Sequence, residues 1–282
     1  MSTARTTARA VALITVSALG LTACGLTKGD AEGPAPDDSG VTKITVGASP
    51  TPHAKILEYV DKELAPDAKL DLEIKTFDDY VQPNVQLSEG TLDANYFQHL
   101  PYYEEQVEDR GYDFAHYDGI HIEPFALYAD SIDDIKDLPK GGTIGINNDP
   151  SNQGRALQLL ADHDVITLKD GVDATNATIF DIQDNPKNLK LVETDPAQLV
   201  RSLEDLDAAV INGNYAIEAD LSTKDALAVE DGKDSPYANF LAVQKANEDN
   251  AGLKKLDELL HSPEVKAYIE ETWPQGEVLP AF

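Results

Sequence analysis

The chain has 282 residues, of which 41% are hydrophobic, so it can form one large or two medium domains with cores of their own and does not resemble a disordered chain. Its 51 acidic and 22 basic side chains leave a net charge of −29, which argues against binding to nucleic acid and against electrostatic adhesion to anionic lipid. A single cysteine excludes an intramolecular disulfide.

The N-terminus is predicted to be a targeting segment and not part of the fold. Arg5 and Arg9 form a basic start, and Ala10–Leu21 is an apolar stretch too short to span a bilayer. The small residues before Cys24 resemble a bacterial lipobox, which implies cleavage at that point and a diacylglycerol on the cysteine sulfur. We therefore expect a lipoprotein signal peptide over residues 1–23.

A flexible tether is predicted to follow the anchor. Residues 24–40 consist of the lipidated Cys24 and then mainly Gly, Pro and acidic residues, with almost nothing apolar. Two acyl chains anchor a protein stably where one does not. The folded body is therefore expected on the extracytoplasmic side of a cell membrane, held there by its lipid.

From Val41 onward strands and helices alternate. Alternating apolar residues predict strands, and apolar residues at helical spacing predict helices, the second of which is interrupted by Pro83. Such βαβαβα alternation predicts a parallel sheet with helices on both faces. The predicted strands are 42–49, 70–74 and 92–97, and the predicted helices are 52–64, 80–87 and 101–110.

The alternation starts again after residues 120–129, an apolar run that contains Pro124 and is predicted to be an edge or crossover strand. Further strands are predicted at 143–147, 189–192, 208–211 and 238–243, and helices at 132–138, 151–163, 196–206, 252–260 and 263–273.

The last strand and two helices make a poor domain alone, so we expect them to complete the first one. The predicted fold is α/β, with two lobes joined by two crossings and a ligand cleft between them. Lobe I is predicted to comprise residues 41–122 plus 238–282, and lobe II residues 123–237.

The turn at residues 147–158 is the first candidate site. A strand that turns sharply into a helix directs free backbone N–H groups and the positive end of the helix at one point. Arg155, in the predicted helix, adds a planar cation suited to a carboxylate or a phosphate. The alternative is an ordinary connection with an arginine on the surface.

Catalytic motifs are absent from the sequence. There is no nucleophile elbow, Ser-x-x-Lys, His-Glu-x-x-His or phosphate-binding loop, and the only cysteine is assigned to the anchor. The six histidines are scattered; His116 and His121 could meet in a hairpin, but a zinc site needs three or four ligands. We expect no enzyme activity, no metal and no cofactor.

Polar and aromatic residues cluster where predicted strands end, which is where open α/β sheets bind ligands. Aromatic walls with one arginine and several side-chain amides suit a small zwitterion with an apolar side chain. Core packing remains the alternative role for each aromatic residue, and capping of a turn for each asparagine. The candidates are Tyr96, Phe97, Gln98, His99, Tyr102, Asn152, Arg155, Asn212, Asn214, Tyr215 and Asn239.

Four ordered motifs resemble the NlpA/MetQ family, the methionine-binding lipoproteins of ABC importers. The resemblance covers Val41 to Phe282, and the segment Phe180–Pro186 also fits it. The family implies a two-lobed periplasmic-binding-protein fold (type II-like) that holds its ligand in the cleft between the lobes. The four motifs are Leu92–His99 with Pro101-Tyr102, Asn148–Leu157, Val210–Ala216 and Ser235–Asn239.

The resemblance also implies roles for individual residues. Arg155 would take the methionine carboxylate, supported by backbone N–H groups around Asn152, and Asn212 and Asn239 would bind the head group. The thioether would lie among Tyr80, Phe97, His99 and Tyr102. Asp220, where the family pattern favours Gly, and the acidic surface depart from that pattern outside the proposed pocket.

The expected function is capture of methionine, as the L or the D isomer, and its delivery to a membrane permease powered by an ATPase. One alternative keeps this role for another ligand, such as a methionine-containing dipeptide or a different apolar amino acid. The other is a surface adhesion or signalling lipoprotein that has lost transport.

Overall fold

The computed structural model describes residues 33–233 and 235–282. The predicted signal peptide, Cys24 and part of the tether lie outside the described residues. No helix in the described ranges has the length and apolar character needed to cross a membrane.

The first of two large sheets has the strand order β13-β4-β12-β3-β1-β2. β1 (Thr42–Ala48) pairs in parallel with β2 (Leu70–Thr76) and with β3 (Ala94–His99). β12 (Asn239–Gln244) lies antiparallel between β3 and β4 (Phe114–Ile122), and β13 (Leu279–Pro280) adds the last edge. The C-terminal strand β12 thus lies in the middle of a sheet that the N-terminal residues begin.

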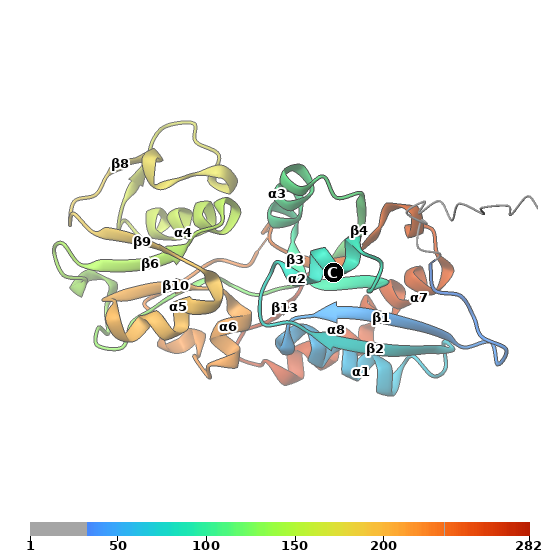
Figure 1. The fold of residues 1–282 in the computed structure, drawn as a ribbon. Helices are drawn as coiled ribbons and strands as arrows, with labels where there is room; N and C mark the ends of the chain where they lie inside the picture. Colours follow the sequence, from blue (N-terminus) through green and yellow to red (C-terminus); the bar gives the residue numbers. More distant parts are fainter. Residues whose placement is uncertain (1–32, 234) are drawn as a thin grey trace, which may run out of the picture. The chain divides into compact units, whose positions relative to one another are not determined.

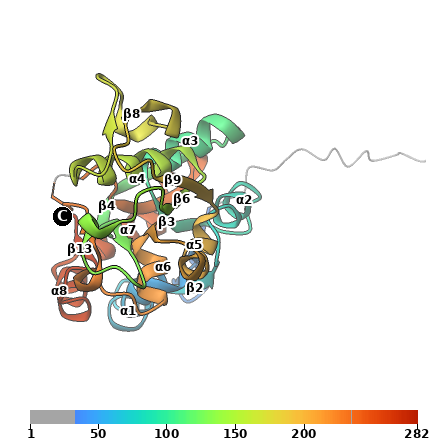
Figure 2. The ribbon, with the colours of Figure 1, turned by 90° about the vertical axis from the view of Figure 1, so that its left-hand side faces the viewer.

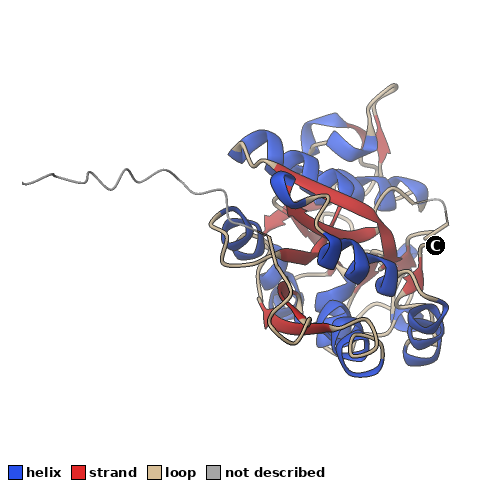
Figure 3. Ribbon diagram, turned by 90° about the vertical axis from the view of Figure 1, so that its right-hand side faces the viewer, coloured by secondary structure: helices blue, strands red, loops and turns tan. Residues whose placement is uncertain are grey.

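Helices cover both faces of this sheet (Figures 1 and 3). Alternation along β12 explains why: Leu241 and Val243 pack toward α1, α7 and α8, whereas Phe240 and Ala242 pack toward α2 and α3. Burying each of the larger side chains, Phe240, Leu241 and Val243, contributes roughly 1.5–3 kcal/mol. The helices are α1 (Lys55–Glu63), α2 (Gln82–Ser88), α3 (Leu100–Arg110), α7 (Ala251–Leu260) and α8 (Pro263–Thr272), with a π-type turn at Pro50–Ala54 before α1.

The second sheet has the order β11-β5-β10-β6-β9. Its central strand β10 (Ala208–Ile211) is fully buried, with Ala208 and Val210 in the cluster beside α4 and Ala209 and Ile211 in the cluster beside α5 and α6. Figure 2 shows α4 on one side of this sheet and α5 and α6 on the other. The remaining elements are β5 (Ala126–Tyr128), β6 (Thr143–Asn147), β9 (Lys190–Thr194), β11 (Ala228–Val229), α4 (Pro150–Asp162), α5 (Pro196–Ser202) and α6 (Gly213–Glu218).

Shorter strands and turns connect the main elements. A two-stranded sheet of β7 (Thr167–Leu168) and β8 (Ile182–Asp184) lies beyond α4 (Figure 2). Single 3-10 turns occur at Ile135–Asp137, Ala174–Asn176, Ile179–Asp181, Leu203–Asp205, Thr223–Asp225 and Lys245–Asn247.

The chain crosses between the sheets twice, after β4 and before β12, as the predicted two-lobed α/β fold requires. Two details of the prediction are wrong. The first sheet is mixed and not parallel, because β4, β12 and β13 run against their neighbours. The helix expected over 132–138 is only the 3-10 turn Ile135–Asp137, since it is too short to bury an apolar face and Pro139 follows directly.

The run 120–129 is two strands and not one. β4 begins at Phe114, among polar residues that hid it from the pattern, and Pro124 separates its end from β5. Asp220, where the family pattern favours Gly, has φ = 57° just after α6. That left-handed conformation explains the preference for Gly there, although Asp tolerates it better than most residues.

Candidate ligand-binding site

The turn before α4 is capped more completely than the sequence suggested. Asp149 is the N-cap and accepts a hydrogen bond from the Asn152 N–H at 2.9 Å. The Ser151 N–H donates to the Glu105 carboxylate on α3 at 3.0 Å. The expectation that the N–H groups around Asn152 are free to bind an anion is therefore wrong, because two carboxylates of the chain itself occupy them.

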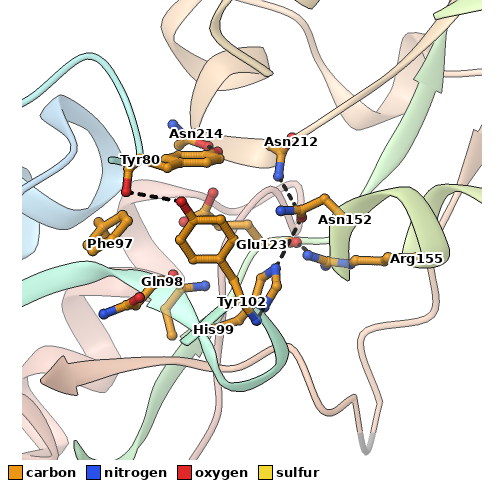
Figure 4. A pocket seen from close by; sticks show the side chains of 11 residues that line it. Tyr80, Phe97, Gln98, His99, Tyr102, Glu123, Asn152, Arg155, Asn212 and Asn214 are labelled. Carbon is orange, nitrogen blue, oxygen red and sulfur yellow. Dashed lines mark hydrogen bonds between the residues drawn. The ribbon is translucent and has the colours of Figure 1, made fainter. Parts of the chain in front are cut away.

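One cavity, with about 340 Å³ of space when its opening to solvent is included, gathers the candidate residues (Figure 4). They come from the carboxyl ends of β3 and β10, from the helices α3, α4 and α6, from the loop before α2 and from the first residue of β12. All eight ligand-binding residues expected from the sequence line it, together with Gln98, Asn214 and Glu123. The eight are Tyr80, Phe97, His99, Tyr102, Asn152, Arg155, Asn212 and Asn239.

Aromatic rings form one end of the cavity. The ring centroid of Tyr80 lies 6.0 Å from that of Phe97, 5.8 Å from that of Tyr102 and 5.2 Å from that of Tyr215. The Tyr102 hydroxyl donates to the Tyr80 carbonyl at 3.2 Å, which holds the two rings edge to face. This end can hold an apolar side chain but offers little to a charged one.

Side-chain amides connect the two sheets across the middle of the cavity. Burial, and secondarily the charge of Arg155, lower the pKa of His99 to about 3, so its ring is neutral. The Tyr102 N–H donates to Nδ1 of His99, so Nε2 carries the proton and donates to Asn152 Oδ1 at 3.1 Å. The Asn212 amide donates to the same oxygen at 3.1 Å (Figure 4).

Arg155 has an internal carboxylate partner, which the sequence did not reveal. Its Nε lies 3.0 Å from Glu230 Oε1, and its Nη2 lies 2.5 Å from Glu230 Oε2 and 2.9 Å from the carbonyl of Glu123. The guanidinium lies over the rings of Phe125 and Tyr237, 4.7 Å and 4.2 Å from their centroids. Among the described residues nothing is hydrogen-bonded to Nη1.

Glu123 is the lining residue that the sequence analysis missed. It is buried, with its Oε1 lying 2.8 Å from Nε2 of His121 and 3.3 Å from Nε2 of His53. Burial raises the pKa of Glu123, while His53, Arg155 and the backbone N–H of Asn214 act to lower it. An acid inside the apolar run 120–129 was the available signal, obscured by the many acids elsewhere.

The two histidines beside Glu123 are neutral. Burial lowers the pKa of His53 to about 4 and that of His121 to about 3. The Tyr96 hydroxyl bonds to Nδ1 of His121, and His53 Nε2 lies 3.1 Å from Asn239 Oδ1. His53, His121 and Glu123 are the one group in the described ranges whose ligand atoms, within 4.8 Å of one another, could hold a metal ion. Hydrogen bonds already engage the atoms that face each other, so we assign no metal to them.

Two mixed α/β sheets, two crossings and an enclosed cavity at the strand ends define a two-lobed binding protein of the periplasmic type. The model of the NlpA lipoprotein family matches residues 44–282, so the chain belongs to the NlpA lipoprotein family.

Named relatives agree with this assignment. The methionine-binding lipoprotein MetQ of Bacillus subtilis is 40% identical over 273 residues, which cover 95% of this chain and 96% of that one. The D-methionine-binding lipoprotein MetQ of Escherichia coli is 39% identical over 245 residues, which cover 86% of this chain and 90% of that one. A nutrient binding protein from Burkholderia cenocepacia, solved bound to methionine, is 44% identical with a TM-score of 0.81, covering 85% of this chain and 100% of that one.

Proposed function

We propose that this protein captures methionine in the cavity between its sheets and passes it to an ABC importer. One observation carries the proposal: a buried carboxylate and a buried guanidinium lie at one end of a cavity whose other end is aromatic. A free amino acid with an apolar side chain matches this arrangement group by group. Support comes from relatives that are named for methionine binding and from one solved with methionine bound.

The ligand ammonium is assigned to Glu123: burial raises the pKa of this carboxyl and its histidine partners are neutral, so a cation beside it would stabilise its charged form. Asn212 and Asn239 add side-chain oxygens and amides near the head group. The ligand carboxylate is assigned to the Nη1 edge of Arg155, the edge that Glu230 leaves open.

The thioether is assigned to the aromatic end, among Tyr80, Phe97, His99 and Tyr102. Sulfur beside an aromatic ring contributes about 0.3–1.5 kcal/mol per contact. Asn152 acts as a bridge in this assignment, since its side chain joins His99 to Asn212 and its backbone N–H is taken by Asp149.

Ligand entry requires the lobes to separate, because the lining side chains are largely buried. We place lobe I at residues 41–122 plus 238–282, lobe II at 123–237, and the hinge at the two crossings. Hydrogen bonds between the lobes break on opening: Tyr80 Oη to Asn214 Oδ1 at 2.5 Å, His99 Nε2 to Asn152 Oδ1 at 3.1 Å, and Tyr215 Oη to the Asp78 carbonyl at 3.0 Å.

We further propose a lipid anchor at Cys24, residence on the extracytoplasmic face of the cell membrane, and a permease with its ATPase as partners. The chain would perform no covalent chemistry and would need no cofactor. Expression of a Cys24→Ser variant tests the anchor: the protein should move from the membrane fraction to the soluble fraction. Unchanged membrane retention would contradict lipidation at this residue.

Calorimetry with L-methionine, D-methionine, Gly-Met and L-leucine tests the ligand. We expect L- or D-methionine to bind tightest, since the cavity has one acidic and one basic group for the two ends of a single amino acid. Tighter binding of Gly-Met or leucine would reassign the ligand within the same role. No binding by any of the four would favour an adhesion or signalling role.

A further inference from the structure

Glu230 lies outside the set of residues that line the cavity, yet it makes most of the hydrogen bonds of Arg155. Both its carboxylate oxygens lie near Nε, at 3.0 Å and 3.2 Å, and Oε2 also accepts from Nη2 at 2.5 Å. Its side chain is 17% exposed, whereas that of Arg155 is 5% exposed. This is a side-on pairing in which the carboxylate covers one full edge of the guanidinium.

Glu230 is also hydrogen-bonded to the first crossing. The Glu230 N–H donates to the Phe125 carbonyl at 2.8 Å, and Glu230 Oε2 accepts from the Phe125 N–H at 3.2 Å. These bonds continue the antiparallel pairing of β11 with β5. Since Glu230 begins the return crossing, its position is defined by both connections between the lobes.

The other sides of the guanidinium are also occupied by the crossings. Phe125 lies on one crossing and Tyr237 on the other, and the Arg155 guanidinium lies over both rings. Nη2 reaches the carbonyl of Glu123, also on the first crossing. The two aromatic rings, the Glu123 carbonyl and the Glu230 carboxylate therefore occupy the faces, the Nη2 group and the Nε edge of the guanidinium. Only Nη1 is left for a ligand in the cavity.

We infer that Glu230 is a positioning residue that holds Arg155 so that its Nη1 edge faces the ligand carboxylate. It also keeps the guanidinium from turning toward the Glu123 carboxylate, which would join the two recognition charges to each other. This inference rests on the proposed function, because it presumes an amino-acid carboxylate in the cavity.

The test compares L-methionine with L-methioninamide, which has the same side chain and amino group but no carboxylate. Affinities are measured at mildly acidic pH, where the amine of the amide is protonated and where His53 and His99, with pKa values of about 4 and 3, remain neutral. The variants are Glu230→Ala and Glu230→Gln. The matched control is Asp231→Asn, which removes the same charge from an exposed neighbour whose carboxylate caps only the Lys233 N–H.

In the wild type, methionine should bind more tightly than the amide. Glu230→Ala should reduce this preference by about tenfold, because the loss of a fixed Arg155 orientation outweighs the positive charge that the substitution leaves uncancelled. Methionine binding should weaken, and amide binding should stay within about twofold of the wild type. Glu230→Gln keeps an oxygen acceptor for Nε and should recover part of the preference, whereas Asp231→Asn should match the wild type.

An unchanged or increased preference in Glu230→Ala would overturn the inference, as would an equal loss for both ligands, which indicates general damage to the pocket. Melting temperatures of all variants identify such damage independently. Failure of the wild type to bind either compound would instead refute the proposed function, so the two failures are distinguishable.

Discussion

Glu123 and Arg155 are two buried charges beside one cavity, but the fold compensates them differently. The Glu123 carboxylate is hydrogen-bonded to the ring of His121 and lies 3.3 Å from that of His53, and both rings are neutral. Arg155 is paired with a full counter-charge, the carboxylate of Glu230. Neutral donors orient a charge without cancelling it, whereas a counter-ion cancels much of it. Glu123 should therefore contribute more to ligand affinity than Arg155.

The largest effect is expected from Glu123→Gln. The substitution keeps the shape but removes the charge that we assign to the ligand ammonium, so methionine binding should weaken by about 2–5 kcal/mol. Calorimetry measures the loss. Glu104→Gln, at an exposed acid on α3, is the control and should bind like the wild type. A loss below twofold would remove Glu123 from the site.

A smaller loss, about 1.5–3 kcal/mol, is expected from Arg155→Ala, because the ligand carboxylate shares the guanidinium with Glu230. This variant also leaves the Glu230 carboxylate without its cation, so its melting temperature should fall. Arg155→Ala could instead weaken methionine binding more than Glu123→Gln does. That result would mean that the counter-charge beside each group does not govern ligand affinity. Affinity within twofold of the wild type would mean that Arg155 does not bind the carboxylate.

Tyr80→Phe should weaken methionine binding moderately, because it destabilises the closed arrangement of the lobes and does not change the charge of the pocket. The hydroxyl bonds to Asn214 across the cleft at 2.5 Å, and a hydrogen bond of this kind contributes about 0.5–1.5 kcal/mol. We expect weaker binding through faster ligand release, measured by stopped-flow fluorescence. Tyr117→Phe removes a hydroxyl that bonds to the Glu248 carbonyl at 3.0 Å within the first sheet region, and it should leave release unchanged.

The smallest effect concerns a histidine outside the pocket. Burial acts to lower the pKa of His261, but hydrogen bonds to Asp257 and Gly119 outweigh it and raise the pKa to about 9. The protonated ring therefore adds stability that is fully present below about pH 6.5 and is lost as the pH rises through about 9. The melting-temperature difference between wild type and His261→Ala should shrink over that interval. A difference independent of pH would refute the assignment of charge.

His53, His99 and His121 should have the opposite pH dependence. Their folded-state pKa values lie at about 4, 3 and 3, below the ordinary value, so the unfolded chain takes up protons first as the pH falls. Stability from these three groups is thus lost below about pH 6.5. The contrast with His261 arises because His53, His99 and His121 are more deeply buried, so the cost of desolvating their charged forms outweighs their polar contacts, whereas the hydrogen bonds of the less buried His261 ring outweigh that cost.

Local patterns in the sequence predicted most of the strands and helices. Alternation in β1 and β10 and helical spacing in α1 and α7 were visible because each element buries residues according to its own period. β4 was largely missed because His116, Tyr117 and Asp118 occupy a strand whose exposed positions carry no apolar signal. The short strands β7, β8 and β11 were also missed, since two or three residues cannot display a period.

The sequence by itself determined the fold class, the two crossings and the eight residues that meet at the cavity. The fold class and the crossings follow from apolar periodicity, whereas the set of eight residues follows from the resemblance to the NlpA/MetQ family. Only the tertiary structure decided the charge balance of the site. Glu230 lies 75 residues after Arg155, and His53 lies 186 residues before Asn239, so no local pattern could join either pair. The energy of a buried charge depends on the groups that surround it in space, and those groups are brought together only when both sheets have formed.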